Sequence, residues 1–412
     1  CCVCMIFYYY NVIVLLLFAL DNTDFTMGSI GTASTEFCYD VFKEMKVQPV
    51  QQNILFSPLA VMSALSLVSL GAKENTRDQI DKVVHFDKIT GYGEAIESQC
   101  GAALSVHTSL KDVFDQITKR SDNYSLNFAS RLYTEKTYPI LPEYLQCVKE
   151  LYKGGLESID FQIAADQARE LINSWVEDET EGAIKNILQP SSVDPQTKIA
   201  LVNAISYKGT WGKAFKEEDT QEVPFRITEQ ETKPVQMMYQ IGSFKVAEVA
   251  SEKMKILELP NTSGKLSMLV LLPDDVSGLE QLETSLTLEK LTEWTSSNLV
   301  EERITKVYLP RIKIEEKYNL TSVLIALGIT DLFSPLADLS GISSTKSLKV
   351  SEAVHEAYVE IHEASSEAGG SPGAGIEATT APEEFKADHP FLILIKHNPT
   401  KSIVFFGRCS SP

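Results

Sequence analysis

The sequence has few basic residues for its acidic content: 37 Lys and Arg stand against 56 Asp and Glu, a formal net charge of −19 at pH 7 over 412 residues. Nucleic acids and anionic membranes are bound through clustered Lys and Arg, so we expect neither as a partner. Glycine and proline are ordinary in number, 21 and 17, and 44% of the residues are hydrophobic. This composition excludes collagen-like and mainly disordered chains and indicates a folded protein with a large core.

Short enzyme motifs are also lacking. His355 and His362 are each followed by Glu, but neither has a second His four residues later, so the zincin helix is absent. The G-x-S-x-G, Walker and G-x-G-x-x-G patterns do not occur. A catalytic triad assembled from distant residues is left open, but nothing points to one. We therefore expect no enzymatic activity, no cofactor and no metal site.

The first 26 residues differ from the rest of the chain. An apolar run from Met5 to Leu20 has no Lys or Arg before it, no small-residue cleavage pattern after it, and is slightly short for a membrane span. Met27 resembles a true start. We interpret residues 1–26 as an extension introduced by gene prediction and residues 27–412 as a single domain, and expect no stable membrane anchor; a genuine signal or anchor is the alternative.

The remaining pattern predicts an α+β domain. Ser57 followed by Pro58 predicts a helix start, a hydroxyl cap and a proline in the first turn, for a helix that runs to Leu70 and stops at Gly71. Helical spacing of apolar residues also occurs at 35–45 and 166–176. Strand-like runs, several apolar on both faces, occupy 199–207, 266–272, 306–309, 357–361, 391–395 and 402–406.

One long segment interrupts this pattern. Residues 363–384 read EASSEAGGSPGAGIEATTAPEE and contain almost no large apolar side chain. A loop of this length inside a compact domain is uncommon and is usually functional or disordered.

Several long motifs carry a family resemblance. They include NILFSPLAVMSALSLVSLGAKENT, LVNAISYKGTWGKAF, KVYLPRIKIEEKYNLTSVLIALGITDLF, LKVSEAVHEAYVEIHEA and FKADHPFLILIKHNPTKSIVFFGRCSSP. With these motifs, the chain from about Gly28 to Pro412 resembles the serpin family, in which proteases cleave an exposed loop. The resemblance implies one domain with three β-sheets, eight or nine helices, and residues 363–384 as the reactive-centre loop. Within the family, the chain is most similar to the non-inhibitory egg-white members.

The resemblance also implies positions where a serpin sheet opens. Inhibitory serpins trap a protease because the cleaved loop inserts into the main sheet as a new strand. The shutter, where that sheet parts, corresponds to Ser57, Asn203 and His355, and the breach, where insertion begins, corresponds to Trp211. An equally weighted alternative is that all four residues only satisfy buried polar groups in a sheet that never opens.

By the same resemblance, the reactive bond lies between Thr379 and Thr380, and Glu363 opens the hinge. Ser366 and Ala368 are small enough to enter a sheet, but Ala364 and Ser365 depart from the acidic residue and glycine of inhibitors. Pro372 would lie within the inserted strand, where it cannot donate a ladder hydrogen bond.

These features favour a non-inhibitory secreted storage protein over a working serine protease inhibitor, the leading alternative. The lost bond at Pro372 costs roughly 1–3 kcal/mol, and ordering each nearby glycine adds about 0.5–1 kcal/mol. Proteases would then meet the loop as a substrate. A chaperone or hormone-carrier role has no sequence feature that separates it from storage.

Four cysteines remain beyond the first 26 residues, and their number alone implies no disulfide. The resemblance pairs Cys100 with Cys147 and leaves Cys38 and Cys409 as free thiols. It also implies a monomer exported through an uncleaved internal signal at about 48–73.

Glycosylation sequons occur at Asn319, Asn261 and Asn123, whereas Asn398 is disqualified by Pro399. Asn319 is the best of them by the resemblance, Asn261 is less favoured, and Asn123 is left undecided. By the resemblance, Ser371 lies at a loop phosphorylation position, but Gly373 replaces the acidic residue two positions later, so its phosphorylation is left undecided.

Overall fold

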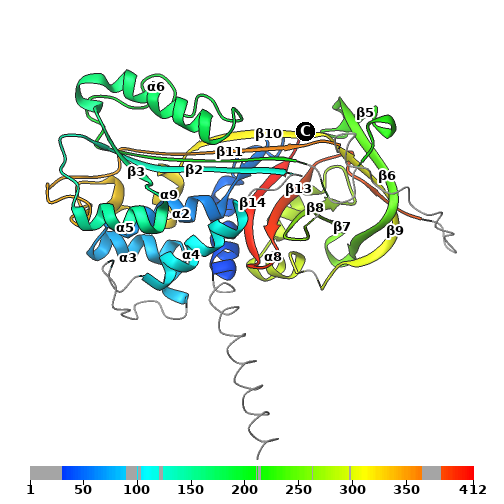
Figure 1. Cartoon of the computed structure of the whole chain (residues 1–412). Coiled ribbons are helices and arrows are strands. Elements are labelled where there is room, and N and C mark those ends of the chain that lie inside the picture. Colours follow the sequence, from blue (N-terminus) through cyan, green and yellow to red (C-terminus); the bar gives the residue numbers. More distant parts are fainter. Residues whose placement is uncertain are drawn as a thin grey trace, which may run out of the picture.

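The structure is a computed structural model. It describes residues 30–89, 100, 104–119, 124–209, 211, 215–261, 263–296, 298–363 and 382–412. The strands within these ranges form two hydrogen-bonded sheets, and the helices pack around them (Figure 1). The α+β class expected from the sequence is confirmed.

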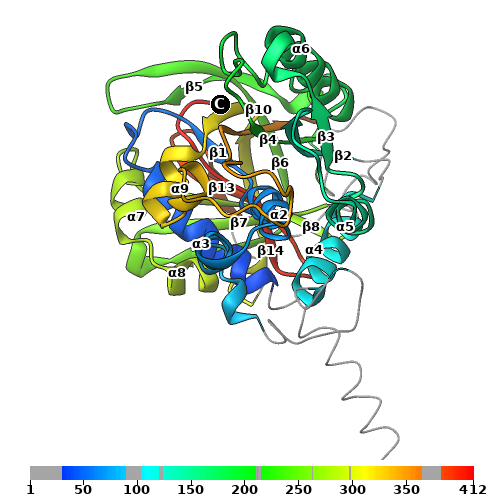
Figure 2. The ribbon, with the colours of Figure 1, turned by 90° about the vertical axis from the view of Figure 1, so that its left-hand side faces the viewer.

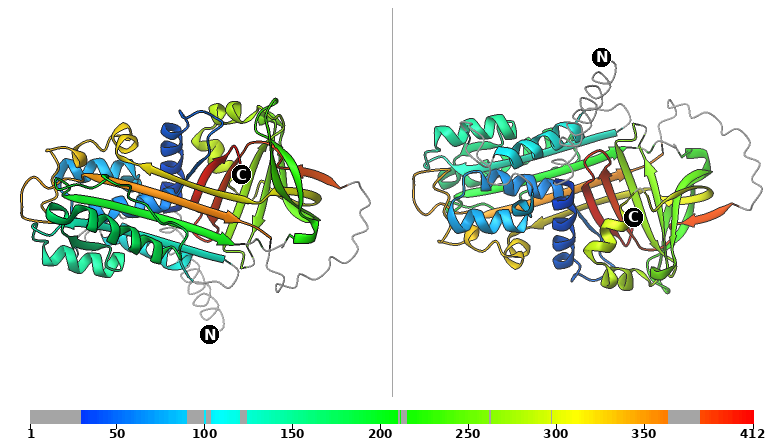
Figure 3. Two further views of the ribbon diagram at one scale, coloured as in Figure 1. Left: turned by 90° about the horizontal axis from the view of Figure 1, so that it is seen from above. Right: turned by 90° about the horizontal axis from the view of Figure 1, so that it is seen from below.

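The smaller sheet has five strands. Its parallel pairs are β11 with β4 and β2 with β3, and its other neighbours are antiparallel. Figure 3 shows its long strands side by side, viewed from above and from below. Its order is β10 (Ile312–Asn319), β11 (Glu352–Ile361), β4 (Ile199–Gly209), β2 (Tyr124–Glu135) and β3 (Leu156–Ile159).

Helices cover both faces of this sheet. α6 (Phe161–Glu179) lies on one face, and α2 (Pro58–Ser69) lies on the other (Figures 1 and 2). The helix over residues 30–45 precedes them in the chain. The other helices are α3 (Glu74–Val83), α4 (Leu104–Ile117), α5 (Pro142–Tyr152), α7 (Leu279–Ser285), α8 (Leu288–Trp294) and α9 (Thr321–Leu327).

The larger sheet has nine strands, and the C-terminal hairpin lies next to its β1 edge strand. Its order is β1 (Ile54–Phe56), β14 (Ser402–Cys409), β13 (Phe391–His397), β8 (Leu266–Pro273), β7 (Met254–Pro260), β6 (Thr232–Val249), β9 (Glu301–Pro310) and β12 (Glu383–Lys386), with β5 (Gln221–Arg226) also paired to β6.

The third sheet implied by the family resemblance is not separate among the described strands. The 18-residue β6 pairs with β9 along Met237–Val246 and with β7 along Lys245–Val249, so it joins two strand groups into one hydrogen-bonded network. The loop boundary also needs correction. Glu383 and Glu384 belong to β12 because they pair with β9, so the loop ends before residue 383.

The predicted helix after Ser57 is confirmed as α2. The Ser57 side chain accepts a hydrogen bond from the Ala60 amide, and Pro58 occupies the first turn. All twelve residues of α2 are buried, which explains why the apolar residues of this helix show no single face. The predicted strand runs coincide with β4, β8, β9, β11, β13 and β14.

Two apolar cores result. The main core lies between the two sheets and the helices around α2, and a smaller one lies between the five-stranded sheet and α6. Within the described ranges, none of the helices has the length and apolar character needed to cross a membrane.

Candidate functional site

The five-stranded sheet contains a continuous parallel contact at the place where the family resemblance predicts loop insertion. β11 and β4 pair in register from Glu352 with Ala200 to Ile361 with Gly209, ten residue pairs in all. Both strands are almost fully buried. A new strand can enter here only if these hydrogen bonds break.

The three predicted shutter residues meet at this contact. His355 on β11 lies directly opposite Asn203 on β4, and its Nδ1 is 2.6 Å from the Asn203 side-chain oxygen. The His355 Nε2 accepts a hydrogen bond of 3.0 Å from the Ser57 backbone amide. All three residues have 0% exposure. The bonds therefore connect both strands to the start of α2.

These contacts fix the state of the histidine ring. Because Nε2 accepts a hydrogen bond, the ring proton is on Nδ1, and this N–H donates a hydrogen bond to the Asn203 side-chain oxygen. Burial lowers the pKa of His355 from its ordinary 6.5 to about 3, so the ring is neutral near pH 7. Asn203 completes the network by donating from its side-chain amide to the Ala60 carbonyl at 3.2 Å.

The predicted breach residue, Trp211, lies at the end of β4. Its ring stacks on Tyr207, with centroids 5.4 Å apart, and Tyr207 stacks in turn on Tyr124 at 5.9 Å. Burial raises the pKa of the Tyr207 hydroxyl. The indole N–H has no hydrogen-bond partner among the described residues. This stack closes the end of the parallel contact with aromatic surface.

The base of the predicted loop is held by Glu363, just after β11. Its side chain is 6% exposed and accepts from the Arg311 Nε, which lies 3.0 and 2.8 Å from the two carboxylate oxygens. The Thr220 hydroxyl donates to the same carboxylate. Burial opposes the charge, but these hydrogen bonds outweigh it and lower the pKa of Glu363.

The other loop predictions lie outside the described residues. They concern Ala364, Ser365, Ser366, Ala368, Pro372, Thr379 and Thr380.

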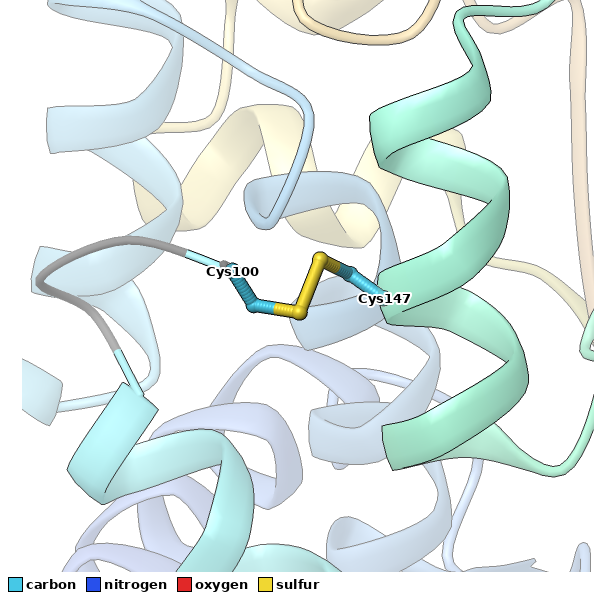
Figure 4. Close-up of a disulfide and its surroundings, with 2 residues drawn as sticks. All are labelled: Cys100 and Cys147. Atoms are coloured by element: carbon cyan, nitrogen blue, oxygen red, sulfur yellow. A yellow bond between two sulfur atoms is a disulfide. The ribbon is translucent and has the colours of Figure 1, made fainter. Parts of the chain in front are cut away.

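The cysteines lie as the family resemblance implies. Cys100 and Cys147 form a disulfide with their Cα atoms 5.6 Å apart, and Cys147 projects from α5 (Figure 4). Cys38 and Cys409 are free and buried. Burial raises the pKa of both thiols, so the reactive thiolate is disfavoured in each.

The two described sequons differ in accessibility. Asn319 is exposed at the end of β10, where its side-chain nitrogen donates to Glu352. Asn261 is 4% exposed, and its side-chain nitrogen, the atom that would carry a glycan, is buried without a partner among the described residues. The fold therefore has room for a glycan at Asn319 and none at Asn261.

Among the described residues, no group of His, Cys, Asp and Glu side chains has an arrangement that would hold a metal ion.

Sequence reasoning missed the residues that hold Glu363. Arg311 is 52 residues away and Thr220 is 143 residues away, and neither belongs to a local pattern. Arg311 lies inside the KVYLPRIKIEEK motif, so the family motif was the only available signal.

Comparison with known families and structures decides the classification. The family model described as "Serpin (serine protease inhibitor)" matches residues 32–412. The chain belongs to the serpin family. The serpin fold is thereby confirmed along with the resemblance that suggested it.

Ovalbumins are among the most similar relatives. Ovalbumin from Dromaius novaehollandiae is 71% identical over 386 residues, which cover 94% of this chain and all of the relative. The crystal structure of uncleaved ovalbumin at 1.95 Å matches with a TM-score of 0.86 and 66% identity, covering 93% of this chain and all of that chain.

A second solved structure shows a different state of the same relative. A cleaved, loop-inserted ovalbumin carrying an arginine-to-threonine mutation matches with a TM-score of 0.82 and 63% identity, covering 93% of this serpin and all of that chain. Loop insertion is thus physically possible in a close relative.

Proposed function

We propose that this serpin is a non-inhibitory storage protein, secreted like the egg-white ovalbumins it resembles. The observation that carries the proposal is the similarity to ovalbumin over that relative's entire length. The proposal assigns no enzymatic activity and no cofactor.

The loop sequence supports a non-inhibitory role. Insertion would place Pro372 in a central strand and would order Gly369, Gly370, Gly373 and Gly375. These costs total several kcal/mol, and if half of that raises the insertion barrier, the rate falls about a hundredfold or more. A slow loop allows the acyl-enzyme to hydrolyse first, so the protease is released.

Inhibition remains the second candidate because one observation favours it. Ser366 is small, whereas familiar ovalbumin has an arginine at this position, and a mutant ovalbumin that lost an arginine is loop-inserted after cleavage. Insertion after cleavage would therefore not by itself establish inhibition. The rate of loop insertion relative to the rate of acyl-enzyme hydrolysis decides between storage and inhibition.

The test is incubation of the purified protein with pancreatic elastase and, separately, with trypsin. We expect clean cleavage in the loop and no complex that survives SDS. A Pro372→Ala variant is the matched comparison, and we expect cleavage of this variant to raise the melting temperature more than cleavage of the parent protein. An SDS-stable protease complex with the parent protein would refute the storage function.

Export, assembly and processing complete the proposal. We propose a secreted monomer with an uncleaved internal signal at about 48–73, a glycan at Asn319, and proteases as loop-cleaving partners. Sequencing the N-terminus of protein secreted from cultured oviduct cells tests the signal. An N-terminus upstream of residue 48 is expected, whereas cleavage within 48–73 would contradict it.

A further inference from the structure

A cavity of about 820 Å³ lies at the β2 side of the five-stranded sheet, away from the β4 and β11 contact. Its lining includes consecutive β2 residues, Tyr124 to Phe128, and then Ser130 and Arg131. Successive side chains of a strand point to opposite faces. A single cavity lined by side chains from both faces of β2 must therefore run along the edge of the strand rather than over one face.

This part of β2 is an open sheet edge. β3 pairs with β2 only from Leu132 to Glu135, and the bond between the Leu132 amide and the Gly155 carbonyl marks the side on which β3 lies. Hydrogen-bonding groups alternate sides along an antiparallel strand. The backbone groups of Tyr124, Leu126, Phe128 and Ser130 therefore face the cavity. None of them has a partner there among the described residues.

Two polar side-chain atoms at the cavity are also unsatisfied. The Ser130 hydroxyl and the Arg131 Nε are buried and have no hydrogen-bond partner among the described residues. The Arg131 guanidinium is already fixed, because one nitrogen is 2.6 Å from Glu157 and its carbon is 4.0 Å from the Trp175 ring centroid. Buried donors without partners are costly, so the cavity is suited to a ligand with hydrogen-bonding groups.

The walls restrict the shape of that ligand. The lining includes Leu67 of α2, Phe114 of α4 and Trp175 of α6. Figure 2 shows β2 and β3 at the sheet margin, with α6 beyond one face and α4 and α5 beyond the other. Helices on both sides leave access for one extended chain and exclude the flat edge of a second folded sheet.

The charged side chains that line the cavity balance in sign. Four basic residues stand against four acidic ones: Lys111, Lys119, Arg131 and Lys153 against Asp115, Asp178, Glu179 and Glu181. Charge thus selects neither an acidic nor a basic ligand, and the open backbone groups dominate recognition.

We propose that this groove binds an extended, uncharged peptide segment of another protein, which adds as a strand along Tyr124–Ser130 in line with β3. Main-chain hydrogen bonds supply the affinity in this mode of binding. The site is independent of the storage function, and it differs from loop insertion because the parallel contact of β4 with β11 stays intact.

The experiment uses the full chain and a probe peptide, acetyl-Val-Thr-Val-Thr-Val-Thr-Val-amide, with residue-resolved hydrogen exchange. With free probe at ten times its dissociation constant, exchange at Leu126, Phe128 and Ser130 should slow about tenfold. The amides of Asn127 and Ala129, which face β4, should not change. A probe methylated on alternate backbone nitrogens should give no protection.

Two variants test the same edge from the protein side. Ser130→Pro removes an edge-facing amide, at a position where proline is tolerated, and should weaken probe binding at least tenfold. Ser130→Ala retains the amide and loses only the unpaired hydroxyl, so it should weaken probe binding less than Ser130→Pro does. Absence of protection by the probe, or equal protection by the methylated probe on the parent protein, would overturn the proposal even if Ser130→Pro failed to fold.

Discussion

Arg311 and Glu363 join the connection between β9 and β10 to the end of β11: one guanidinium nitrogen lies 2.8 and 3.0 Å from the two carboxylate oxygens. Glu363 is the base of the predicted reactive loop. Because Thr220 donates to the same carboxylate, the Glu363 side chain is held from two sides.

Glu363→Gln removes the charge of this contact. We expect the free energy of unfolding at pH 7 to fall by about 1 kcal/mol, a modest value because the Arg311 side chain is 39% exposed. The folded-state pKa lies below the ordinary value of 4.5, so the stabilisation is present above pH 4.5 and is lost as the pH falls through the folded value.

Urea unfolding at pH 7 and pH 3 measures both effects for Glu363→Gln. The difference between parent and variant should shrink at pH 3. The exposed Glu229→Gln is the control and should change stability little at either pH. An equal loss at both pH values would show that charge is not the cause.

Asn203→Ala removes the centre of the shutter network. The variant leaves the His355 ring N–H and the Ala60 carbonyl without their side-chain partner. We expect a loss of about 2–4 kcal/mol in unfolding free energy, since both groups are buried. Asn298→Ala, at an exposed position, should cost less than about 0.5 kcal/mol. Similar losses for the two variants in denaturant titrations would contradict a buried network at β4 and β11.

His397→Gln should alter the pH dependence of stability. Burial lowers the pKa of His397 from 6.5 to about 4, so between these values the unfolded chain binds more protons than the folded chain. Stability contributed by the neutral ring therefore rises with pH across this window, by up to about 1.4 kcal/mol per pH unit.

The glutamine side chain does not titrate, so the stability of His397→Gln should depend less steeply on pH between 4 and 6.5. It can still bond to Thr400, the partner of His397 at 2.8 Å. Urea midpoints at half-unit pH steps measure this. Parallel pH profiles for the two proteins would refute the assignment.

Cys147→Ser tests the disulfide. The bond closes a segment with a sequence separation of 47, and the chain-entropy relation gives about 4 kcal/mol of stabilisation for a loop of this length. We expect a loss of that order in unfolding free energy. Reductant should reduce the stability of the parent to that of the variant and leave the variant unchanged; a further loss in the variant would require another reducible bond.

Asn319→Gln tests glycan attachment. The exposed Asn319 should carry the glycan, so protein secreted from animal cells should lose a gel shift in this variant and after endoglycosidase treatment. Asn261→Gln is the matched comparison and should retain the shift. A shift that depends on Asn261 would mean that this segment is modified before it becomes buried.

Local sequence patterns predicted the elements whose cause is local. Ser57 and Pro58 mark the start of α2 through capping, and the unbroken apolar run of β4 indicates a strand buried on both faces. β2 was not predicted: Tyr124 to Phe128 alternate apolar and polar residues over only five positions, and Ala129 to Arg131 break the alternation. The shutter required the family motif, since Ser57 and His355 are 298 residues apart and no periodicity relates them. The open edge of β2 follows only from where β3 begins to pair.

The last strands to leave the ribosome lie inside the larger sheet, between the edge strand β1 and β8. β14 separates β1 from β13, and β13 connects β14 to β8, so this sheet cannot be completed while translation continues. α2 packs against β14 as well as against β2 and β4, so its burial is complete only after β14 has joined the sheet. The segment proposed to direct export therefore keeps part of its surface uncovered until synthesis ends. This delay would let the translocation machinery contact the segment before folding covers it.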